Sequence, residues 1–253
     1  TTEDCQDFYR TYYAPNNASI VVVGDVTEAA LLAKVQKAYG HLAPSTLPLE
    51  DVRPEPPQTE ERRRELSKPT ATEKLAVGYH SPAIGDFDHP ALSLLSEVLF
   101  GGRASRMHQA LVRKLEIASE VRVFVGPFRD PGLTEIYASA RGTHTAETLL
   151  AEIDREIARV CEEAIPEAEI ERARARTELS LVAGLESADG KASTIGFYDT
   201  ILGRPGAAFE RLDELARVTA SDLRRVARRY LVPERRTVIL VRAQTGEKKE
   251  AAE

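Results

Sequence analysis

The sequence predicts an α+β fold in which an antiparallel or mixed sheet is covered by helices on one face. Two patterns lead to this prediction: short segments with apolar residues at alternate positions, and longer segments with an apolar residue every three or four positions. From residue 61 onward the order is one strand, two helices, two strands, several helices and a final strand. Strands separated by helical blocks, with one hairpin among them, are typical of a sheet that has helices on one side.

The first 43 residues contain a helix, a strand and a second helix. Residues 2–13 have an amphipathic pattern, and the helix is expected to stop before Pro15. Residues 18–23 include an unbroken run of β-branched side chains, which predicts a strand buried on both faces. Residues 27–40 carry an apolar stripe that ends at a glycine, as many helices do.

Residues 44–60 interrupt these patterns. They contain five prolines, at positions 44, 48, 54, 56 and 57. Proline cannot continue a helix, and it cannot donate a hydrogen bond to a sheet ladder. We therefore expect a stiff linker here, followed by a separate unit at residues 61–245 and a disordered, charged tail at residues 246–253.

The elements beyond the linker follow from the same two patterns. The Arg-Asp-Pro-Gly turn at residues 129–132 is typical of a connection that joins two strands as a hairpin. Thr219, with Asp222 three positions later, resembles a capping box that opens a helix. The expected strands are residues 74–80, 119–127, 133–141 and 238–241, and the expected helices include residues 88–99, 105–115, 149–160, 170–185 and 223–230.

Composition excludes several classes of protein. A formal net charge of −6 argues against a nucleic-acid partner, which requires a clustered positive field. No run approaches the roughly 20 apolar residues of a membrane-spanning helix. Cys5 and Cys161 provide neither a disulfide framework nor a Cys-x-x-Cys zinc pattern. We expect a soluble protein, with the bacterial cytoplasm and the periplasm both open as its compartment.

Two elements of the sequence, in this order, resemble those of one family. The first joins Tyr-x-x-Asn at residues 13–16 to Val-Val-x-Gly-Asp at residues 21–25. The second, at residues 88–107, has an Asp-x-Pro-Ala helix start, a Gly-Gly pair and a Ser-Arg-Met element. Both resemble the pitrilysin/insulinase-type zinc metallopeptidases, or inverzincins, which include processing peptidases. The resemblance extends through Arg242.

This resemblance implies a fold and a set of partners. The fold would be a ferredoxin-like α+β repeat, duplicated in each half of a clam-shaped molecule. Residues 1–43 would be the C-terminal part of a catalytic domain, and residues 61–245 a complete non-catalytic repeat. The longer parent protein would hold zinc, act on a peptide substrate, and pair with a second half or subunit as a homodimer or heterodimer.

The chain itself lacks the sequence motifs of zinc hydrolysis, nucleophilic catalysis and phosphate binding. Zinc hydrolysis in the family uses His-x-x-Glu-His on a helix, and no two histidines here are three, four or five positions apart. The sequence also lacks Gly-x-Ser-x-Gly and both phosphate-loop spacings. We therefore expect no catalytic residue, metal ligand or cofactor in this chain, and no activity of the chain alone. The histidines are at positions 41, 80, 89, 108 and 144.

One departure from the family pattern bears on the role of the repeat at residues 61–245. The substrate-assisting half of the family carries an arginine and, seven residues later, a tyrosine after the Ser-Arg-Leu element. Val112 and Ser119 stand at these positions here, and valine cannot bind a peptide carbonyl. The arginine and tyrosine would thus come from another half or subunit. The residues expected to face a chamber are Gly101, Gly102, Arg103, Ser105, Arg106, Val112 and Ser119.

The leading hypothesis is a non-catalytic C-terminal portion of a zinc-dependent endopeptidase, forming part of a chamber that encloses a peptide. The alternative is a zinc-free scaffold or assembly subunit of the same fold. An unrelated α+β binding module is a third interpretation. A His-x-x-Glu-His motif before Thr1 would support the first hypothesis, and its absence would support the second.

Overall fold

The computed structural model describes residues 1–50, 53 and 55–244, so the predicted tail at residues 246–253 lies outside the described residues. The chain divides into two compact units. The larger contains Pro57–Leu179 and Glu210–Glu253, and the smaller contains Thr1–Pro56 and Ser180–Phe209. The first crossing between the units falls within the expected linker, and residues 180–209 group with the N-terminal segment.

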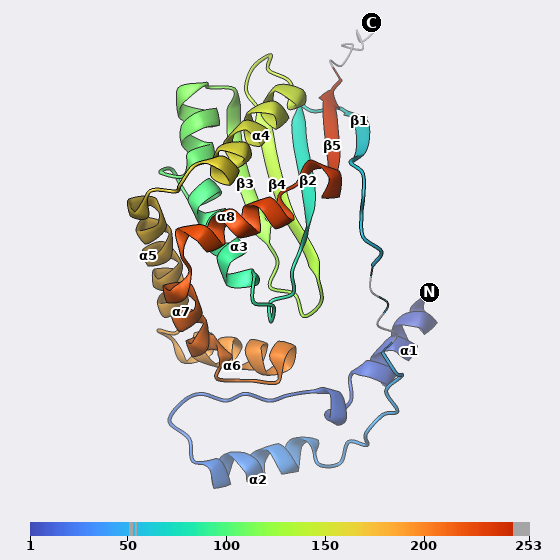
Figure 1. Ribbon diagram of the computed structural model, residues 1–253. Coiled ribbons are helices and arrows are strands. Elements are labelled where there is room, and N and C mark those ends of the chain that lie inside the picture. The colour runs from blue at the N-terminus through green and yellow to red at the C-terminus, as the bar shows by residue number, and fades with distance from the viewer. Residues whose placement is uncertain (51–52, 54, 245–253) are drawn as a thin grey trace, which may run out of the picture. The chain divides into compact units, whose positions relative to one another are not determined.

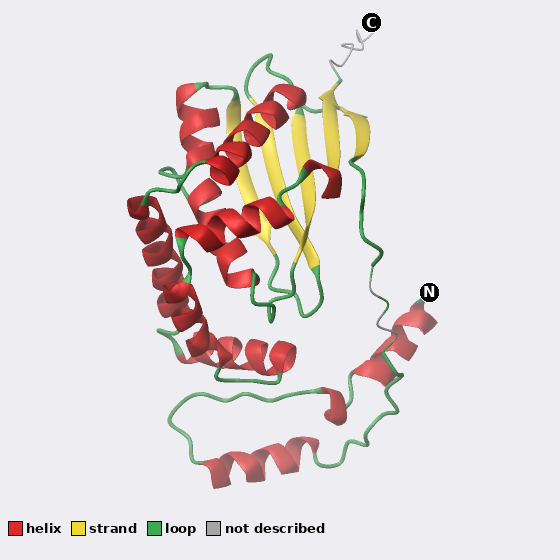
Figure 2. Ribbon diagram, in the orientation of Figure 1, coloured by secondary structure: helices red, strands yellow, loops and turns green. Residues whose placement is uncertain are grey.

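A five-stranded mixed sheet forms the centre of the larger unit (Figures 1 and 2). The strand order is β1-β5-β2-β4-β3. The pair β1 and β5 is parallel, and the other neighbouring pairs are antiparallel. The strands are β1 (Arg62–Lys68), β2 (Lys74–Ser81), β3 (Ala118–Val125), β4 (Gly132–Ala140) and β5 (Arg236–Ala243).

Three helices lie on one face of this sheet: α3 (His89–Phe100), α4 (Ala146–Glu162) and α8 (Ala220–Tyr230). Figure 1 shows α4 and α8 crossing the strands on that face. Alternate residues of the central strands are buried beneath them, because successive strand side chains point to opposite faces. In β2 these are Leu75, Val77 and Tyr79, as the alternation predicted. The α+β fold with helices on one face is confirmed.

Local sequence signals account for several helix ends. The capping box at Thr219 is present, since its hydroxyl accepts from the Asp222 amide and the Asp222 carboxylate accepts from the Thr219 amide. The Thr145 hydroxyl caps α4 in a similar way, by accepting from the Thr148 amide. The remaining helices are α1 (Thr2–Tyr12), α2 (Glu28–Tyr39), α5 (Glu167–Gly184), α6 (Ala188–Leu202), α7 (Ala207–Arg217), the 3-10 turns η1 (Pro15–Asn17) and η3 (Pro233–Arg235), and the π-helical segment η2 (His108–Lys114).

One predicted element is wrong, and one strand was not predicted. Residues 18–23 form no strand in the described part of the chain. Ile20 is 56% exposed and Val22 is 42% exposed, because no described strand lies beside them to pair with their backbone and cover their side chains. Strand β1 was not predicted because its sequence, Arg-Arg-Arg-Glu-Leu-Ser-Lys, has no apolar alternation.

Candidate functional site

The face of the sheet opposite the helices is only partly covered. Its side chains are half-buried or exposed, whereas their neighbours along β2, β4 and β5 are mostly buried beneath α3, α4 and α8. The strand register aligns these open-face residues in rows across the sheet. One row crosses β5, β2, β4 and β3 as Ile239, Ala76, Tyr137 and Arg122.

A shallow hollow of about 140 Å³ lies on this open face. Gly78 of β2 contributes no side chain, and a Cβ built there would lie 3.5 Å from a methyl group of Leu133. The hollow is therefore a place where a small apolar group can approach the sheet backbone. Its lining residues are Ala76, Val77, Gly78, Leu133, Glu135, Tyr137, Thr237 and Ile239.

A polar cluster borders the hollow on the side of β4 and β3. The Tyr137 hydroxyl donates a hydrogen bond to the Glu135 carboxylate over 2.9 Å, and this bond raises the pKa of Tyr137. The Arg122 guanidinium lies over the Tyr137 ring, 4.9 Å from its centroid, and pairs with Glu120 at 3.3 Å. These contacts hold the tyrosine ring at the edge of the hollow.

The glycine loop predicted to face a chamber contacts helix α5. Arg106 forms a two-pronged ion pair with Glu169, with its Nε 2.7 Å from one carboxylate oxygen. Gly102 has a φ of +74°, and a Cβ there would lie 2.2 Å from a guanidinium nitrogen of Arg176. Ser105 is buried, and its hydroxyl donates to the Gly102 carbonyl over 2.8 Å. The loop thus has a structural role in positioning the start of α5.

The other expected chamber residues are dispersed. Gly101 is the C-cap of α3, and Arg103 is exposed in the loop that follows. Val112 is half-buried within the π-helical segment η2, whereas Ser119 is exposed near the start of the edge strand β3. The Ser119 hydroxyl donates to the Ser139 carbonyl over 3.3 Å. Neither side chain lines the hollow at Gly78.

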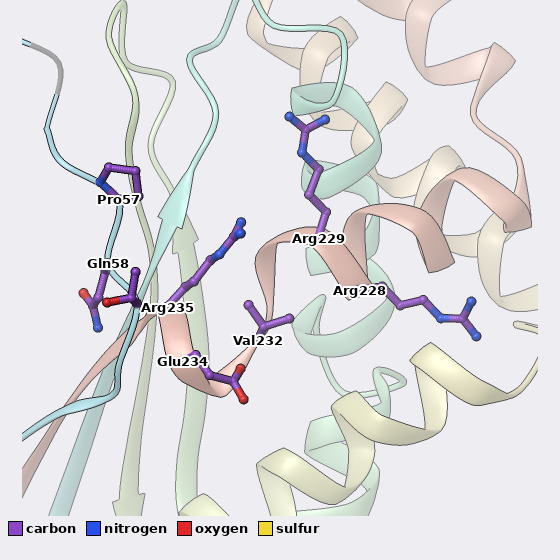
Figure 3. Close-up of a pocket in the computed structure, with 8 residues that line it drawn as sticks. Pro57, Gln58, Arg228, Arg229, Val232, Glu234 and Arg235 are labelled. Atoms are coloured by element: carbon purple, nitrogen blue, oxygen red, sulfur yellow. The ribbon is translucent and has the colours of Figure 1, made fainter.

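A second, wider hollow of about 550 Å³ lies between residues 57–59 and the end of α8 (Figure 3). Three arginines line it, but Figure 3 shows Arg228 and Arg229 pointing in different directions. Arg228 donates to the Cys161 carbonyl over 2.8 Å, and Arg229 donates to Asp88 over 2.8 Å. Because two of its three cations are already bound to other groups, this hollow is a weaker candidate than the open face.

The described residues of the two units do not fit a zinc site. Within the described part of the chain, no group of three or more histidine, cysteine, aspartate or glutamate side chains is placed to hold a metal ion. None of the described helices is long and apolar enough to cross a membrane.

The sequence indicated the positions of the open-face residues but not their neighbours. Tyr137 lies between Ile136 and Ala138, which are buried, so alternation alone places it on the opposite face. Its proximity to Gly78 depends on the register between β2 and β4. No local signal in the sequence gives that register, and the hollow was therefore missed.

Comparison with known proteins adds the family context. Residues 1–177 match the family model of the peptidase M16 inactive domain. The zinc protease PqqE of Helicobacter pylori is 27% identical over 96% of this chain and 55% of its own length. An uncharacterized zinc protease of Streptomyces coelicolor is 28% identical over 91% of this chain and 51% of its own length. The chain thus spans about half the length of these curated relatives.

Solved structures agree with this match. The crystal structure of a protease from Helicobacter pylori superposes with a TM-score of 0.86 at 26% identity, covering 96% of this chain and 59% of that one. The peptidase M16 inactive domain from Pseudomonas fluorescens superposes with a TM-score of 0.81 at 18% identity, covering 98% of this chain and 58% of that one. The second likeness shows the fold alone.

Proposed function

Because this chain belongs to the M16 peptidase family and carries its inactive domain, we propose that it forms one wall of a peptide-enclosing chamber in a zinc-dependent endopeptidase. Within the residues that the structure describes, no group of three or more potential ligands is placed to hold zinc. Zinc and the hydrolytic step belong to the remaining part of the longer protein, and the names of the curated relatives as zinc proteases support this assignment.

The observation that carries the proposal is the open face of the sheet. A sheet that is covered on both sides offers no surface to a ligand, but here one face is left half-exposed around the hollow at Gly78. That face combines apolar side chains, such as Leu133, with hydrogen-bonding groups, such as Tyr137 and Glu135. Such a mixture is typical of surfaces that bind peptides, where apolar contacts give affinity and a few polar groups give orientation.

The exposed apolar residues of the smaller unit support the proposal that this chain is part of a longer enzyme. Ile20 and Val22 are 56% and 42% exposed, and Leu32 and Tyr39 of α2 are each 53% exposed. Apolar residues exposed in this number along one segment indicate an interaction surface. We assign residues 1–43 to the end of the preceding catalytic domain, whose other strands and helices would cover them.

The experiment uses the longer protein, from the portion before Thr1 through this chain. We expect zinc in that protein and cleavage of unfolded peptides. Tyr137→Ala on the open face should lower kcat/KM without changing the zinc content, whereas Glu163→Ala, an exposed residue just after α4, should have no effect. A longer protein without a His-x-x-Glu-His motif and without bound zinc would support the scaffold alternative instead.

A further inference from the structure

Two arginines of the edge strand β1 point toward the open face beside the hollow. In the register between β1 and β5, Arg62 is paired with Thr237 and Arg64 is paired with Ile239. Thr237 and Ile239 both line the hollow. Paired residues of neighbouring strands project to the same face of a sheet. Arg62 and Arg64 therefore stand next to the hollow. Figure 1 shows their strand, β1, at the edge of the sheet beside β5.

These two arginines are available to a ligand. Both are exposed, and neither has an acidic partner within ion-pair distance among the residues that the structure describes. Arg63 and Glu65 alternate with them along the same strand and project toward the helix-covered face. Arg63 lies 4.0 Å from Glu61, and Glu65 pairs with Arg242 at 3.2 Å. These two arginines without an acidic partner therefore form a local positive charge on a chain whose net charge is −6.

The spacing of these groups corresponds to that of an extended peptide. Gly78 lies on β2, two strands from β1, and neighbouring strands are about 4.8 Å apart, so the hollow is roughly 10 Å from the row of arginines. In an extended chain, residues two or three positions apart are separated by roughly 7 to 10 Å. A peptide with one side chain in the hollow can thus place a second, two or three residues away, near Arg62 or Arg64.

We propose that the open face selects acidic peptide segments, in which an aliphatic side chain enters the hollow at Gly78 while neighbouring carboxylates bind Arg62 and Arg64. The inference rests on the proposed function and specifies the substrate class of that same surface. The hollow of about 140 Å³ has room for one branched aliphatic side chain. A guanidinium group binds a carboxylate through two parallel hydrogen bonds, which makes arginine well suited to this role.

An acidic peptide fits this face better than a nucleic acid does. Single-stranded nucleic acid binds along a positively charged groove that follows its backbone. On this face the Arg122 guanidinium is already paired with Glu120, at 3.3 Å. Glu135 of β4 and Glu120 of β3 lie on the side of the hollow away from β1, so this face favours a ligand whose negative charge is confined to the β1 side over a continuous phosphate backbone.

The first experiment tests the charge on β1. Binding of fluorescent short peptides to the 253-residue chain is measured by anisotropy, with one peptide carrying leucine between glutamates and another carrying leucine between lysines. Arg64→Glu should weaken binding of the acidic peptide about fivefold, as expected for loss of one exposed ion pair. Arg63→Glu is the matched control, with the same charge change on the opposite face, and should weaken it less than about twofold. Equal effects of the two changes would overturn the proposal.

The second experiment tests the hollow. Gly78→Val fills it and favours a strand, so the chain should remain folded. In this variant the glutamate-leucine peptide should bind no better than a matched glutamate-serine peptide.

If lysine-flanked and glutamate-flanked peptides bind equally and Gly78→Val weakens binding of both, acidic selection is wrong while peptide binding stands. If neither peptide binds and Gly78→Val leaves cleavage by the longer protein unchanged, the proposed function fails as well. A single-stranded oligonucleotide that competes fully and depends on Arg64 would identify a polyanion surface instead.

Discussion

Arg211 of α7 donates a hydrogen bond to Nδ1 of His89, a buried histidine at the start of α3, over 2.5 Å. The other ring nitrogen, Nε2, lies 3.5 Å from the Gly126 carbonyl, so the ring is neutral with its proton on Nε2. Burial lowers the pKa of His89 to about 4, and the positive charge of Arg211 acts in the same direction. The interior around α3 and α7 is therefore built for the uncharged ring.

This contact predicts a pH dependence of stability. A histidine in the unfolded chain has an ordinary pKa of 6.5, so between pH 6.5 and about 4 the unfolded state binds a proton that the folded state excludes. The free energy of unfolding should be highest above this window and should fall as the pH is lowered through it, by at most about 1.4 kcal/mol per pH unit. Urea unfolding of the chain across the window measures the slope.

Two substitutions isolate the contribution of His89. In His89→Gln the slope between pH 6.5 and about 4 should become shallower, most clearly at the upper end of this window, where the carboxylates do not titrate. The control is His144→Gln, an exposed histidine in the loop before α4, which should keep the slope. If His89→Gln retains the full slope, the acid sensitivity arises elsewhere.

A second prediction concerns Asp88, which joins α3 to α8. Its carboxylate accepts hydrogen bonds from Arg225, Arg229 and Tyr230, at 2.5, 2.8 and 2.9 Å. Burial raises the pKa of Asp88, but the hydrogen bonds from Arg225 and Tyr230 outweigh it, and the pKa lies below its ordinary value. Asp88→Ala should destabilise the chain by about 2 kcal/mol, a value reduced from that of a fully buried pair because both arginines are partly exposed.

The matched control for Asp88 is Glu120→Ala. Glu120 and its partner Arg122 are both more than half exposed, with side-chain exposures of 61% and 66%. Removing this carboxylate should change the free energy of unfolding by less than about 0.5 kcal/mol. Chemical denaturation of the two variants provides the comparison, and similar losses in both would show that Asp88 does not hold α8 in place.

A third prediction concerns proteolysis of the linker at residues 44–60. We expect the first cuts on its N-terminal side, before Pro57, because prolines prevent helical or ladder protection there. The C-terminal side is held more firmly, since Gln58 is buried and its side-chain amide donates to the carbonyls of Glu60 and Arg236. Limited proteolysis with mass spectrometry locates the cuts. First cuts near Gly126 or Gly184 would contradict the expected division of the chain.

A fourth prediction concerns Val112 and Ser119 in the longer protein. The Ser119 hydroxyl bonds to a carbonyl of the neighbouring strand, and Val112 packs within η2, so neither is free to bind a peptide carbonyl strongly. Val112→Ala and Ser119→Ala should each change kcat/KM by less than about threefold. A hundredfold loss in Ser119→Ala, with unchanged stability and zinc content, would place this repeat in the substrate-assisting role.

Local patterns in the sequence were sufficient for the elements whose stability is local. The Thr219 capping box involves residues three positions apart, and the alternation in β2 reflects burial of Leu75, Val77 and Tyr79 on one face. Strand β1 lacks such a signal because it lies at the sheet edge with all seven residues exposed. Its position is determined by pairing with β5, far away in the sequence.

The open-face site could not be predicted for the same reason, because it depends on pairing between strands that are far apart in the sequence. Its apolar and charged residues come from β1, β2, β4 and β5, and the strands that lie side by side in this part of the sheet (β1 and β5, β5 and β2, β2 and β4) are not consecutive in the chain. The opposite error at residues 18–23 follows from the same physics. An apolar β-branched run predicts a strand, but only a neighbouring strand makes it one.

The position of β5 between β1 and β2 also sets the order in which the sheet can assemble during synthesis. Strands β2, β3 and β4 lie within residues 74–140 and can pair as soon as they leave the ribosome. Strand β1 is made before them, yet its partner at Arg236–Ala243 is among the last segments to emerge. Until then the inner edge of β2 is unpaired and β1 has no ladder to join. A chain that ends before residue 236 should therefore expose this edge and aggregate, even though most of the apolar core is already present.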